Sequence, residues 1–554
     1  MNSQNKFKVV KPIGGVHGIS AIFPTLKDVI DYEEKIVRLN RGYPRFVTHP
    51  FVGKIEETLK NKFHAREVLC CQTFESALFL VFDFYLKKGI KIYTDYDLCH
   101  RLIAFYNKKF KNFIKTAKTL NEADLLIINR KLREKLTDFV NIPKIGIIDA
   151  EKRELYEKFN GMDVLVFNYK EKDIGAIIFY TDIFSEINLL RRHSGFIANS
   201  RKLCPTRAFT RAQFKKHETC LKNKLGELEK VSGNDCFLFP SGMAAIFCTI
   251  LSLFARNKNK IIALGSLYVD TLRILEKWPK KFGFKNNIII YHNFENELLR
   301  VIDNSIAGII FEMPSNPLIQ VIDVEKIVSI AQQKKIPIVI DNTIATPYNF
   351  NPIDFNVDII VHSTTKFLSG KNNHMGGCIL VKNEKLKKKL NDFKNFLNLN
   401  MTFDDIKILN RNIKKFENRM KTINDNAFKV AKFLQNYETI DKVYYPFLES
   451  SSDYLLAKKY LKGGSGLLSF VFKNSSISNA TYFYDNIKSP ILKGPSLGSE
   501  KTLLSPYVIM AHYNDSKEKL LKLGYDFCLM RLSIGTERTE KIIDCLKYAL
   551  ERTK

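Results

Sequence analysis

Short apolar runs rich in β-branched residues recur along most of this chain of 554 residues, and stretches long enough for a helix separate them. Two of these runs, 336–340 and 358–361, each lead directly into polar side chains. Such runs are typical of buried strands in a parallel sheet, whose connections are usually helices. The alternation therefore predicts an α/β fold in which several strands deliver polar groups to one edge of a sheet.

Asp341 follows the first of these two runs, and Ser363, Thr365 and Lys366 follow the second. Because ligands of open α/β sheets bind at the carboxyl ends of strands, these side chains are expected in one crevice. A lysine amine can hold an aldehyde cofactor covalently, and an aspartate can keep the cofactor's ring nitrogen protonated. Asp341 and Lys366 therefore suggest pyridoxal phosphate chemistry, whereas a lysine taken alone is by default a solvated surface residue.

The segment from Asp341 to Gly377 resembles the cofactor-lysine segment of the Cys/Met-metabolism family of pyridoxal phosphate enzymes. This family includes cystathionine synthases and lyases, methionine γ-lyases and O-acetylhomoserine sulfhydrylases. Three further blocks match the family in its order, at 239–245 (FPSGMAA), 312–317 (EMPSNP) and 531–537 (RLSIGTE). The resemblance implies a fold-type I transferase, with a large domain built on a mostly parallel seven-stranded sheet and a smaller α+β C-terminal domain.

The resemblance also implies which residues hold the cofactor. The run 241–243 lies between apolar residues and an expected helix start near Ala244, where backbone amides can bind a phosphate. Tyr268 aligns with the family tyrosine that stacks on the pyridine ring, although Val269 and Asp270 stand where the family usually has glycines. The expected cofactor contacts are Lys366, Asp341, Gly242, Met243, Ser363, Thr365, Tyr268, Asn316, Tyr43 and Arg45, of which Lys366, Tyr268 and Asp341 are also expected to be catalytic.

The α-carboxylate of an amino-acid substrate needs a planar, permanently charged fork, which arginine supplies. By resemblance, Arg531 takes this place, and Ser496 and Asn316 contact the same substrate. After this serine the family usually has a glycine-rich turn that leads to a glutamate, whereas Glu500 is displaced by one position here. Recognition of the leaving group is therefore left open.

Typical family members place a tyrosine and an arginine before an Asn-Pro-Thr run, and both reach the phosphate of the neighbouring subunit. The corresponding stretch of this chain, 210–217, lacks that pattern. Three arginines are candidates for the missing cation: Arg45, Arg201 and Arg211. Because Tyr43 and Arg45 have the tyrosine-x-arginine spacing, the N-terminal region is expected to supply this arm.

The chain is long enough for two or three domains. An extra N-terminal α/β region is expected at 1–190, the large cofactor domain at 191–395 and the small domain at 396–554. The first region carries none of the four blocks, yet its residues 76–79 can be laid over 244–247. It is therefore either a degenerate half-copy of the catalytic fold or an α/β region with only generic periodicity.

The net charge of +29, from 87 Lys and Arg against 58 Asp and Glu, raises the question of nucleic-acid binding. The lysines are spread through the whole chain, and no nucleic-acid-binding signature accompanies them, so a solvated surface is favoured. Ten cysteines show neither CxxC pairing nor the spacing of His and Cys ligands. We therefore expect no metal, and reduced thiols in a cytoplasmic protein.

Two features argue against a membrane or secreted protein. No uninterrupted apolar stretch approaches the ~18 residues of a spanning helix, and the first residues lack the apolar core of a secretory signal. The expected partners are therefore small amino-acid substrates and further copies of the same chain. Since active sites of this family are built between two subunits, a homodimer or homotetramer with shared active sites is implied.

A narrower likeness rests on the N-terminal extension with GYPRF at 42–46, on 192–195 (RHSG) and on 495–500 (PSLGSE). These features resemble the fungal type of cystathionine γ-synthase, which implies γ-replacement of O-acetyl- or O-succinyl-homoserine with L-cysteine in transsulfuration and methionine biosynthesis. Another activity of the family, as a cystathionine β- or γ-lyase or an O-acetylhomoserine sulfhydrylase, stays open. So does a non-catalytic regulatory protein on the same fold.

Overall fold

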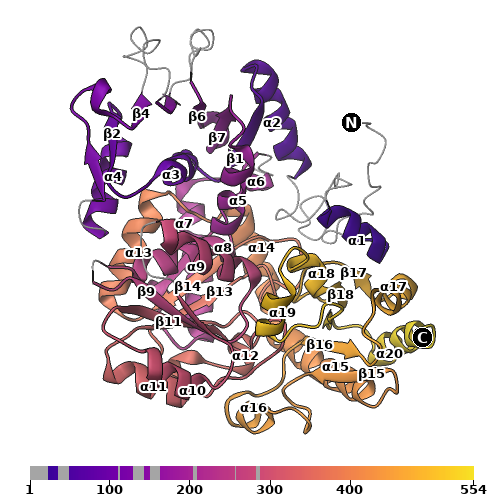
Figure 1. Cartoon of the computed structure of the whole chain (residues 1–554). Coiled ribbons are helices and arrows are strands. Elements are labelled where there is room, and N and C mark those ends of the chain that lie inside the picture. Colours follow the sequence, from indigo (N-terminus) through magenta and orange to yellow (C-terminus); the bar gives the residue numbers. More distant parts are fainter. Residues whose placement is uncertain are drawn as a thin grey trace.

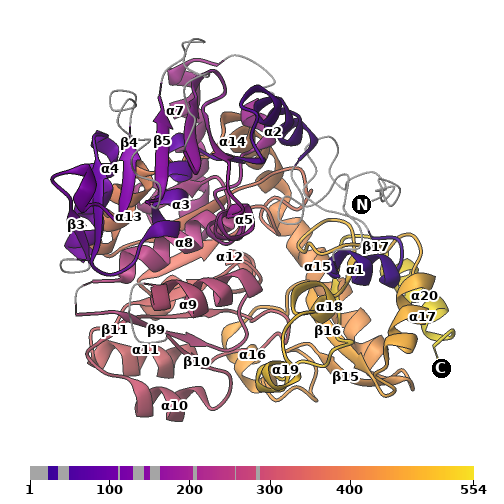
Figure 2. The same cartoon turned by 45° about the horizontal axis from the view of Figure 1, so that its top comes forward.

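Three sheets follow one another along the chain, two with seven strands and one with five. Figures 1 and 2 show the N-terminal sheet above the second sheet, with the third to one side of both. The α/β class and the mostly parallel seven-stranded sheet predicted from the sequence are therefore confirmed. The computed structural model describes residues 23–34, 49–109, 113–128, 142–149, 162–203, 209–255, 257–281 and 287–553.

The N-terminal sheet has the strand order β1-β7-β6-β5-β4-β2-β3. β7 runs antiparallel to both of its neighbours, and the other neighbouring strands run parallel. The apolar runs that begin at residues 68, 90, 125, 145 and 164 all lie in these strands, as predicted. The elements are β1 (Glu67–Cys71), β2 (Ile90–Thr94), β3 (Ile114–Thr116), β4 (Leu125–Ile128), β5 (Lys144–Ile148), β6 (Val164–Tyr169), β7 (Ile174–Phe179), α2 (Pro50–Lys62), α3 (Phe74–Tyr85), α4 (Asp97–Lys109) and α5 (Phe184–Ser194).

The second sheet has the order β10-β9-β11-β12-β13-β14-β8, in which β14 is antiparallel to both neighbours. Its strands are β8 (Cys236–Phe239), β9 (Lys260–Leu264), β10 (Ile288–Ile290), β11 (Ile306–Glu312), β12 (Ile338–Asp341), β13 (Ile359–His362) and β14 (Gly377–Val381). The helices around it are α7 (Arg211–Leu228), α8 (Gly242–Leu253), α9 (Val269–Lys281), α10 (Phe294–Val301), α11 (Val324–Gln333), α12 (Thr346–Asn349) and α13 (Glu384–Phe396). The short helix α6 (Ser200–Leu203) packs on α2 instead, and Leu203 is buried in an apolar cluster of the N-terminal sheet.

The register of β12 and β13 places the predicted polar groups at one edge of this sheet. The two strands are parallel, and Asp341 pairs with Val361 near the carboxyl end of each. The amide of Ile338 donates a hydrogen bond of 2.9 Å to the Asp358 carboxylate, which fixes the start of β12 against the start of β13. Asp341 and the residues after His362 therefore reach the same crevice, as the apolar runs predicted.

The C-terminal sheet has the order β15-β16-β19-β18-β17. Its strands are β15 (Ile440–Tyr444), β16 (Leu467–Phe472), β17 (Leu492–Lys493), β18 (Leu503–Pro506) and β19 (Met530–Ser533). The helices of this part are α14 (Phe403–Asn412), α15 (Phe416–Gln435), α16 (Tyr454–Tyr460), α17 (Ile477–Asn486), α18 (Tyr507–Ala511), α19 (Lys517–Leu523) and α20 (Thr539–Leu550). No helix among the described residues is both long enough and apolar enough to cross a membrane.

Helix α1 (Leu26–Glu33) packs on this C-terminal part although it comes first in the chain (Figure 1). The Leu26 amide donates a hydrogen bond of 2.8 Å to Asp485, and the Tyr484 hydroxyl donates one of 3.1 Å to the Phe23 carbonyl. Phe23, Leu26 and Val29 are buried in the same apolar cluster as α15 and α20. Within the predicted region 1–190, these first described residues therefore belong spatially to the third sheet.

Candidate active site

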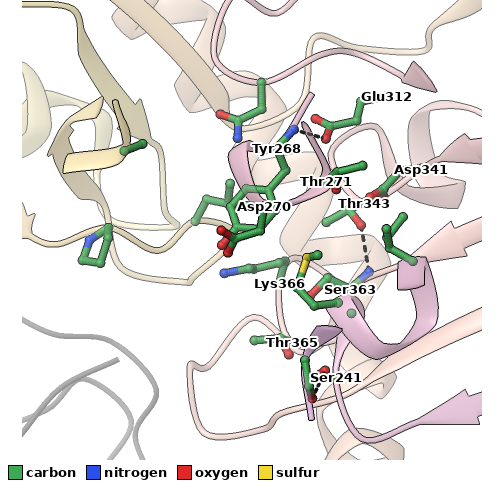
Figure 3. Close-up of a pocket in the computed structure, with 18 of the residues that line it drawn as sticks. Ser241, Tyr268, Asp270, Thr271, Glu312, Asp341, Thr343, Ser363, Thr365 and Lys366 are labelled. Carbon is green, nitrogen blue, oxygen red and sulfur yellow. Dashed lines mark hydrogen bonds between the residues drawn. The ribbon is translucent and has the colours of Figure 1, made fainter. Parts of the chain in front are cut away.

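A pocket opens at the carboxyl ends of β11, β12 and β13, and the first turn of α8 and loops of the C-terminal part complete its wall (Figure 3). Ser496 contacts this pocket through Lys366. Tyr43 and Arg45, predicted to contact the phosphate, lie outside the described residues. The other predicted residues all line the pocket: Gly242, Met243, Tyr268, Asn316, Asp341, Ser363, Thr365, Lys366 and Arg531.

Lys366 lies in the loop that follows β13, and its side chain enters the pocket (Figure 3). Its Nζ donates a hydrogen bond of 3.2 Å to the Ser496 hydroxyl, which donates one of 3.4 Å to Asn372 Oδ1. The Lys366 carbonyl accepts from the amide of Gly370 at 2.8 Å, so the turn around the lysine is closed locally. Backbone and side-chain contacts therefore both hold the amine in one place.

Asp341 lies at the carboxyl end of β12, where its Oδ1 accepts a hydrogen bond of 3.0 Å from the Thr343 amide. Removal from bulk water raises the pKa of this carboxyl, against the hydrogen bonds from Thr343. A carboxyl in this position favours a cationic ligand group, such as a protonated ring nitrogen.

Glu312 is a second buried carboxyl beside the first, since the register of β11 and β12 pairs it with Asp341. Burial and the neighbouring Asp341 raise the pKa of Glu312 well above its ordinary value. It accepts a hydrogen bond from the amide of Tyr268. Glu312 therefore fixes the start of α9, and with it the tyrosine. The sequence marked the block that contains this glutamate but gave it no role.

The first turn of α8 forms a cradle for an anion. Ser241 caps this helix, because its Oγ accepts a hydrogen bond of 3.1 Å from the Ala244 amide. A Cβ on Gly242 would lie 2.7 Å from the Cβ of Ser363, so only glycine fits this approach of the two loops. The free amides of a helix N-terminus bind phosphate well.

Ser363 and Thr365, whose hydroxyls were predicted to complete this cradle, make different hydrogen bonds. Thr365 donates a hydrogen bond of 3.2 Å to the Gly376 carbonyl and accepts one of 3.0 Å from the Gly376 amide. The Ser363 amide donates one of 2.8 Å to Thr343 Oγ1, a side chain that the sequence did not single out. Thr343 therefore ties the loop after β12 to the loop that carries Lys366.

Arg531 comes from β19 of the C-terminal part and is buried beside the pocket. Its Nη1 donates a hydrogen bond of 3.0 Å to Asn316 Oδ1, and its Nη2 donates one of 2.8 Å to the Pro495 carbonyl. The guanidinium carbon lies 4.8 Å from the centroid of the Tyr507 ring. These contacts fix the plane of the fork, as a bidentate carboxylate site requires.

The structure does not bring the described candidates for the phosphate cation to the pocket. Arg201 is buried and pairs with Asp405 at 3.0 Å, and Arg211 is exposed at the start of α7. Arg192, at the end of α5, lines the pocket instead. Glu500 lies within 3.6 Å of Arg419 and is not among the lining residues. The sequence singled out the segment 192–195 for its likeness to the fungal enzymes, but it did not predict that Arg192 lines the pocket.

These features fit pyridoxal phosphate, because one pocket holds a lysine amine, a carboxyl that favours a cation and a cradle for phosphate. Residues 199–551 match the profile of the family described as Cys/Met metabolism PLP-dependent enzyme. The chain belongs to this family. Its cofactor is therefore pyridoxal phosphate, as Asp341 and Lys366 predicted. Nothing before residue 199 takes part in the match.

Curated relatives with several activities resemble this part of the chain. A cystathionine β-lyase of Lactococcus lactis is 31% identical over 337 residues, which cover 60% of this chain and 85% of the relative. A cystathionine γ-lyase of Bacillus subtilis is 30% identical and covers 65% and 90%. A cystathionine γ-synthase of Neurospora crassa is 34% identical over 332 residues, which cover 57% of this chain and 52% of that relative.

Solved structures agree with the family assignment. A crystal structure of a candidate O-acetylhomoserine (thiol)-lyase from Campylobacter jejuni, which contains a pyridoxyl-lysine monophosphate, has a TM-score of 0.57 at 28% identity and covers 60% of this chain and 86% of that one. The cystathionine γ-synthase of Xanthomonas oryzae in complex with cystathionine has a TM-score of 0.58 at 25% identity and covers 63% and 89%. The large and small domains of this chain therefore have the fold of fold-type I enzymes.

Proposed function

We propose that this protein is a cystathionine γ-synthase, which joins an O-acylated homoserine to L-cysteine. The observation that carries the proposal is that Lys366, Asp341 and Arg531 line one pocket, since these are the groups that amino-acid chemistry on pyridoxal phosphate needs. Support for a synthase comes from the fungal relative, which shares 34% identity and also leaves a large part of its length outside the match.

In the proposed reaction the Cγ–O bond of the acylated homoserine breaks and a Cγ–S bond to cysteine forms. The carboxylate leaves with the electron pair of the broken bond, and the cysteine thiol loses one proton. Pyridoxal phosphate, when bound, withdraws electrons from the substrate and so makes its Cα and Cβ protons acidic. The remaining tasks fall to the protein: it must bind the substrate, orient it and move these protons.

Arg531 is proposed to bind the substrate α-carboxylate. Its guanidinium is held by Asn316 and by the Pro495 carbonyl, so little side-chain freedom is lost when the carboxylate arrives. The same contacts would hold Cα near the Lys366 amine, because both side chains line one pocket. Positioning of this kind accounts for a large part of the rate in enzymes that act on bound substrates.

Lys366 is proposed to move protons at Cα and Cβ of the bound substrate. A general base must lie within hydrogen-bond reach of the proton that it takes. The Ser496 hydroxyl, 3.2 Å from Nζ, is placed to orient the amine during these transfers. Asp341 is proposed to hold the ring nitrogen protonated, and Tyr268 to cover the ring face, as the family resemblance implies.

Product analysis tests the proposal. The purified protein, loaded with pyridoxal phosphate, is incubated with O-acetyl- or O-succinyl-homoserine and cysteine, and cystathionine is measured by mass spectrometry. Cystathionine should form with at least one of the two acyl donors, and a Lys366→Ala variant should form it at least ~10²-fold more slowly. In a parallel incubation with sulfide in place of cysteine, homocysteine from a protein that forms no cystathionine would replace the proposal with a sulfhydrylase.

A cystathionine lyase is the second candidate, because lyases of Lactococcus lactis and Bacillus subtilis match at 31% and 30% identity. The same protein given cystathionine should release little pyruvate or 2-oxobutyrate if it is a synthase. Rapid release of either keto acid would favour a lyase. A protein that binds the cofactor but converts none of these compounds would favour the regulatory alternative.

A further inference from the structure

The N-terminal sheet has the same topology as the cofactor sheet. Read from the opposite edge, its order β3-β2-β4-β5-β6-β7-β1 corresponds strand for strand to β10-β9-β11-β12-β13-β14-β8. In both sheets the last strand is antiparallel to its two neighbours, and one of these is the first strand. Generic α/β alternation predicts parallel strands and right-handed crossovers but does not require the same order and direction for all seven strands.

The strand registers agree at the level of single residues. Cys71 pairs with Gly175 in the N-terminal sheet, and Phe239 pairs with Gly377 in the cofactor sheet. In both cases the glycine lies in the last strand, and its partner ends the first strand. Both glycines are also required by the same contact: an added Cβ would lie 2.5 Å from the carbonyl oxygen of the residue that caps the next helix.

A side-chain hydrogen bond is repeated as well. The Asp163 carboxylate accepts from the amide of Lys144 at 2.7 Å, and the Asp358 carboxylate accepts from the amide of Ile338 at 2.9 Å. Each aspartate directly precedes the sixth strand of its domain, and each amide starts the strand beside it. The sequence alignment of 76–79 with 244–247 belongs to the same correspondence, since Thr73 and Ser241 cap the two helices.

At the described positions that correspond to the main cofactor contacts, the N-terminal sheet and its helix lack the groups that would bind the cofactor. Without glycine after the helix cap, a phosphate cannot approach the first amides closely. Without the carboxylate and the lysine, neither the ring nitrogen nor the aldehyde has a partner. Phe74 follows the cap of α3, as Gly242 follows the cap of α8. The register of β5 and β6, continued past the strand ends, aligns Ile147 with Asp341 and Glu171 with Lys366.

Equivalent helices of the two domains, α3 and α8, are in contact and belong to one apolar cluster. The rings of Phe79 and Phe247 are packed edge to face with their centroids 6.0 Å apart. Both phenylalanines lie six residues after the cap of their helix. A residue that contacts its own equivalent lies on or near a two-fold axis.

A reciprocal pair of hydrogen bonds confirms this symmetry. The Thr73 hydroxyl donates a bond of 2.9 Å to the carbonyl of Leu397, which caps the C-terminus of α13. The Ser241 hydroxyl donates a bond of 3.2 Å to the carbonyl of Gly195, which caps the C-terminus of α5. α5 and α13 each follow the last strand of their sheet. Each bond therefore joins the N-cap of the helix after the first strand of one domain to the C-cap of the helix after the last strand of the other domain, and the second bond repeats the first with the domains exchanged.

We infer that residues 49–198 are an inactive copy of the cofactor domain, docked within one chain as the second protomer of a symmetric dimer would be. Apolar residues of both domains share one continuous core cluster. The end of the copy contributes Arg192, Gly195 and Ile197 to the pocket, although these residues precede the family match. We therefore expect a single chain to hold the cofactor without a second chain, whichever acyl substrate it uses.

Native mass spectrometry of the cofactor-loaded protein tests this inference without an activity assay. Upon dilution we expect single chains of 64.1 kDa that each retain one pyridoxal phosphate. Two cofactors per chain would show that the copy still binds. Cofactor found only on assemblies of two or more chains would show that the site needs a second chain. Either result would overturn the inference.

A pair of cap variants tests the interface itself. Thr73→Val removes both a helix cap and the bond to Leu397, whereas Thr210→Val removes a cap of α7 that is exposed. Hydrogen exchange of the peptide that covers residues 397–401 should become several-fold faster in the first variant and stay unchanged in the second. Equal exchange in both variants would show that the reciprocal bond does not hold the two domains together.

Discussion

Replacing Asp405 with asparagine should destabilise the cofactor domain strongly, because this side chain neutralises a buried arginine. Asp405 and Arg201 have exposed side-chain fractions of 0% and 6%, and their Oδ1 and Nη1 lie 3.0 Å apart. Further hydrogen bonds to Asp405 come from Asn199 at 2.7 Å and from Thr402 at 2.6 Å. The carboxylate thus joins the segment after the N-terminal copy to α14.

Removing one partner of a buried ion pair costs about 3–5 kcal/mol, because the other charge stays buried without compensation. At roughly 2–4 °C per kcal/mol for a unit of about 200 residues, the melting temperature of the variant should fall by roughly 6–20 °C. The matched control is Asp404→Asn, which removes the same charge from the neighbouring, half-buried position in the first turn of α14. The free energy of unfolding of this control variant should fall by no more than about 1 kcal/mol.

The pH dependence gives a second measurement. Burial would raise the pKa of Asp405, but the nearby His374 ring and the charge of Arg201 hold it well below the usual value. A depressed pKa stabilises the folded state above the unfolded pKa of about 4, and this stabilisation is lost as the pH falls below it. Urea unfolding should therefore show a full difference from wild type at pH 7 and a smaller one at pH 3. A variant as stable as Asp404→Asn at pH 7 would refute the role given to the pair.

Three further predictions concern the cofactor site. Lys366→Ala should leave no pyridoxyl tag after borohydride reduction and peptide mapping, and turnover should fall at least ~10²-fold; a tag on another lysine would contradict the assignment. Gly242→Ala should weaken cofactor binding roughly 5–150-fold in a fluorescence titration, because its Cβ would overlap Ser363 at a cost of about 1–3 kcal/mol. Gly53→Ala, whose Cβ meets nothing within 4 Å, is the control and should bind normally. Asp341→Asn should stabilise the cofactor-free protein at pH 7 while it weakens cofactor binding, since a carboxyl with a raised pKa destabilises the fold as the pH rises above about 4; equal thermal stability of the two cofactor-free proteins would contradict this.

Much of the site was accessible from the sequence because its signals are local. An apolar run followed by Asp341 and another followed by Lys366 predict two strand ends, and parallel pairing brings strand ends together without further information. Gly242 is also a local signal, because glycine at the start of a helix leaves room for an anion to approach the backbone amides. The family resemblance then supplied the roles that residue types alone left open.

Other features depend on contacts between distant parts of the chain. Arg201 was a candidate for the phosphate cation, but its partner Asp405 lies 204 residues away and no spacing rule links the two. Glu312 and Thr343 act by positioning Tyr268 and the lysine loop, and ordinary residue types in these places carry no signal of that role.

The sequence by itself determined the α/β class, the cofactor and most of the residues around it, because strand patterns and ligand chemistry are written in short segments. Only the tertiary structure decided what the N-terminal region is. Its echo of 244–247 at 76–79 was too weak to separate a copy from generic periodicity. Strand order, register and the packing of Phe79 on Phe247 arise from long-range pairing, so the inference that this region is a copy rests on the tertiary structure.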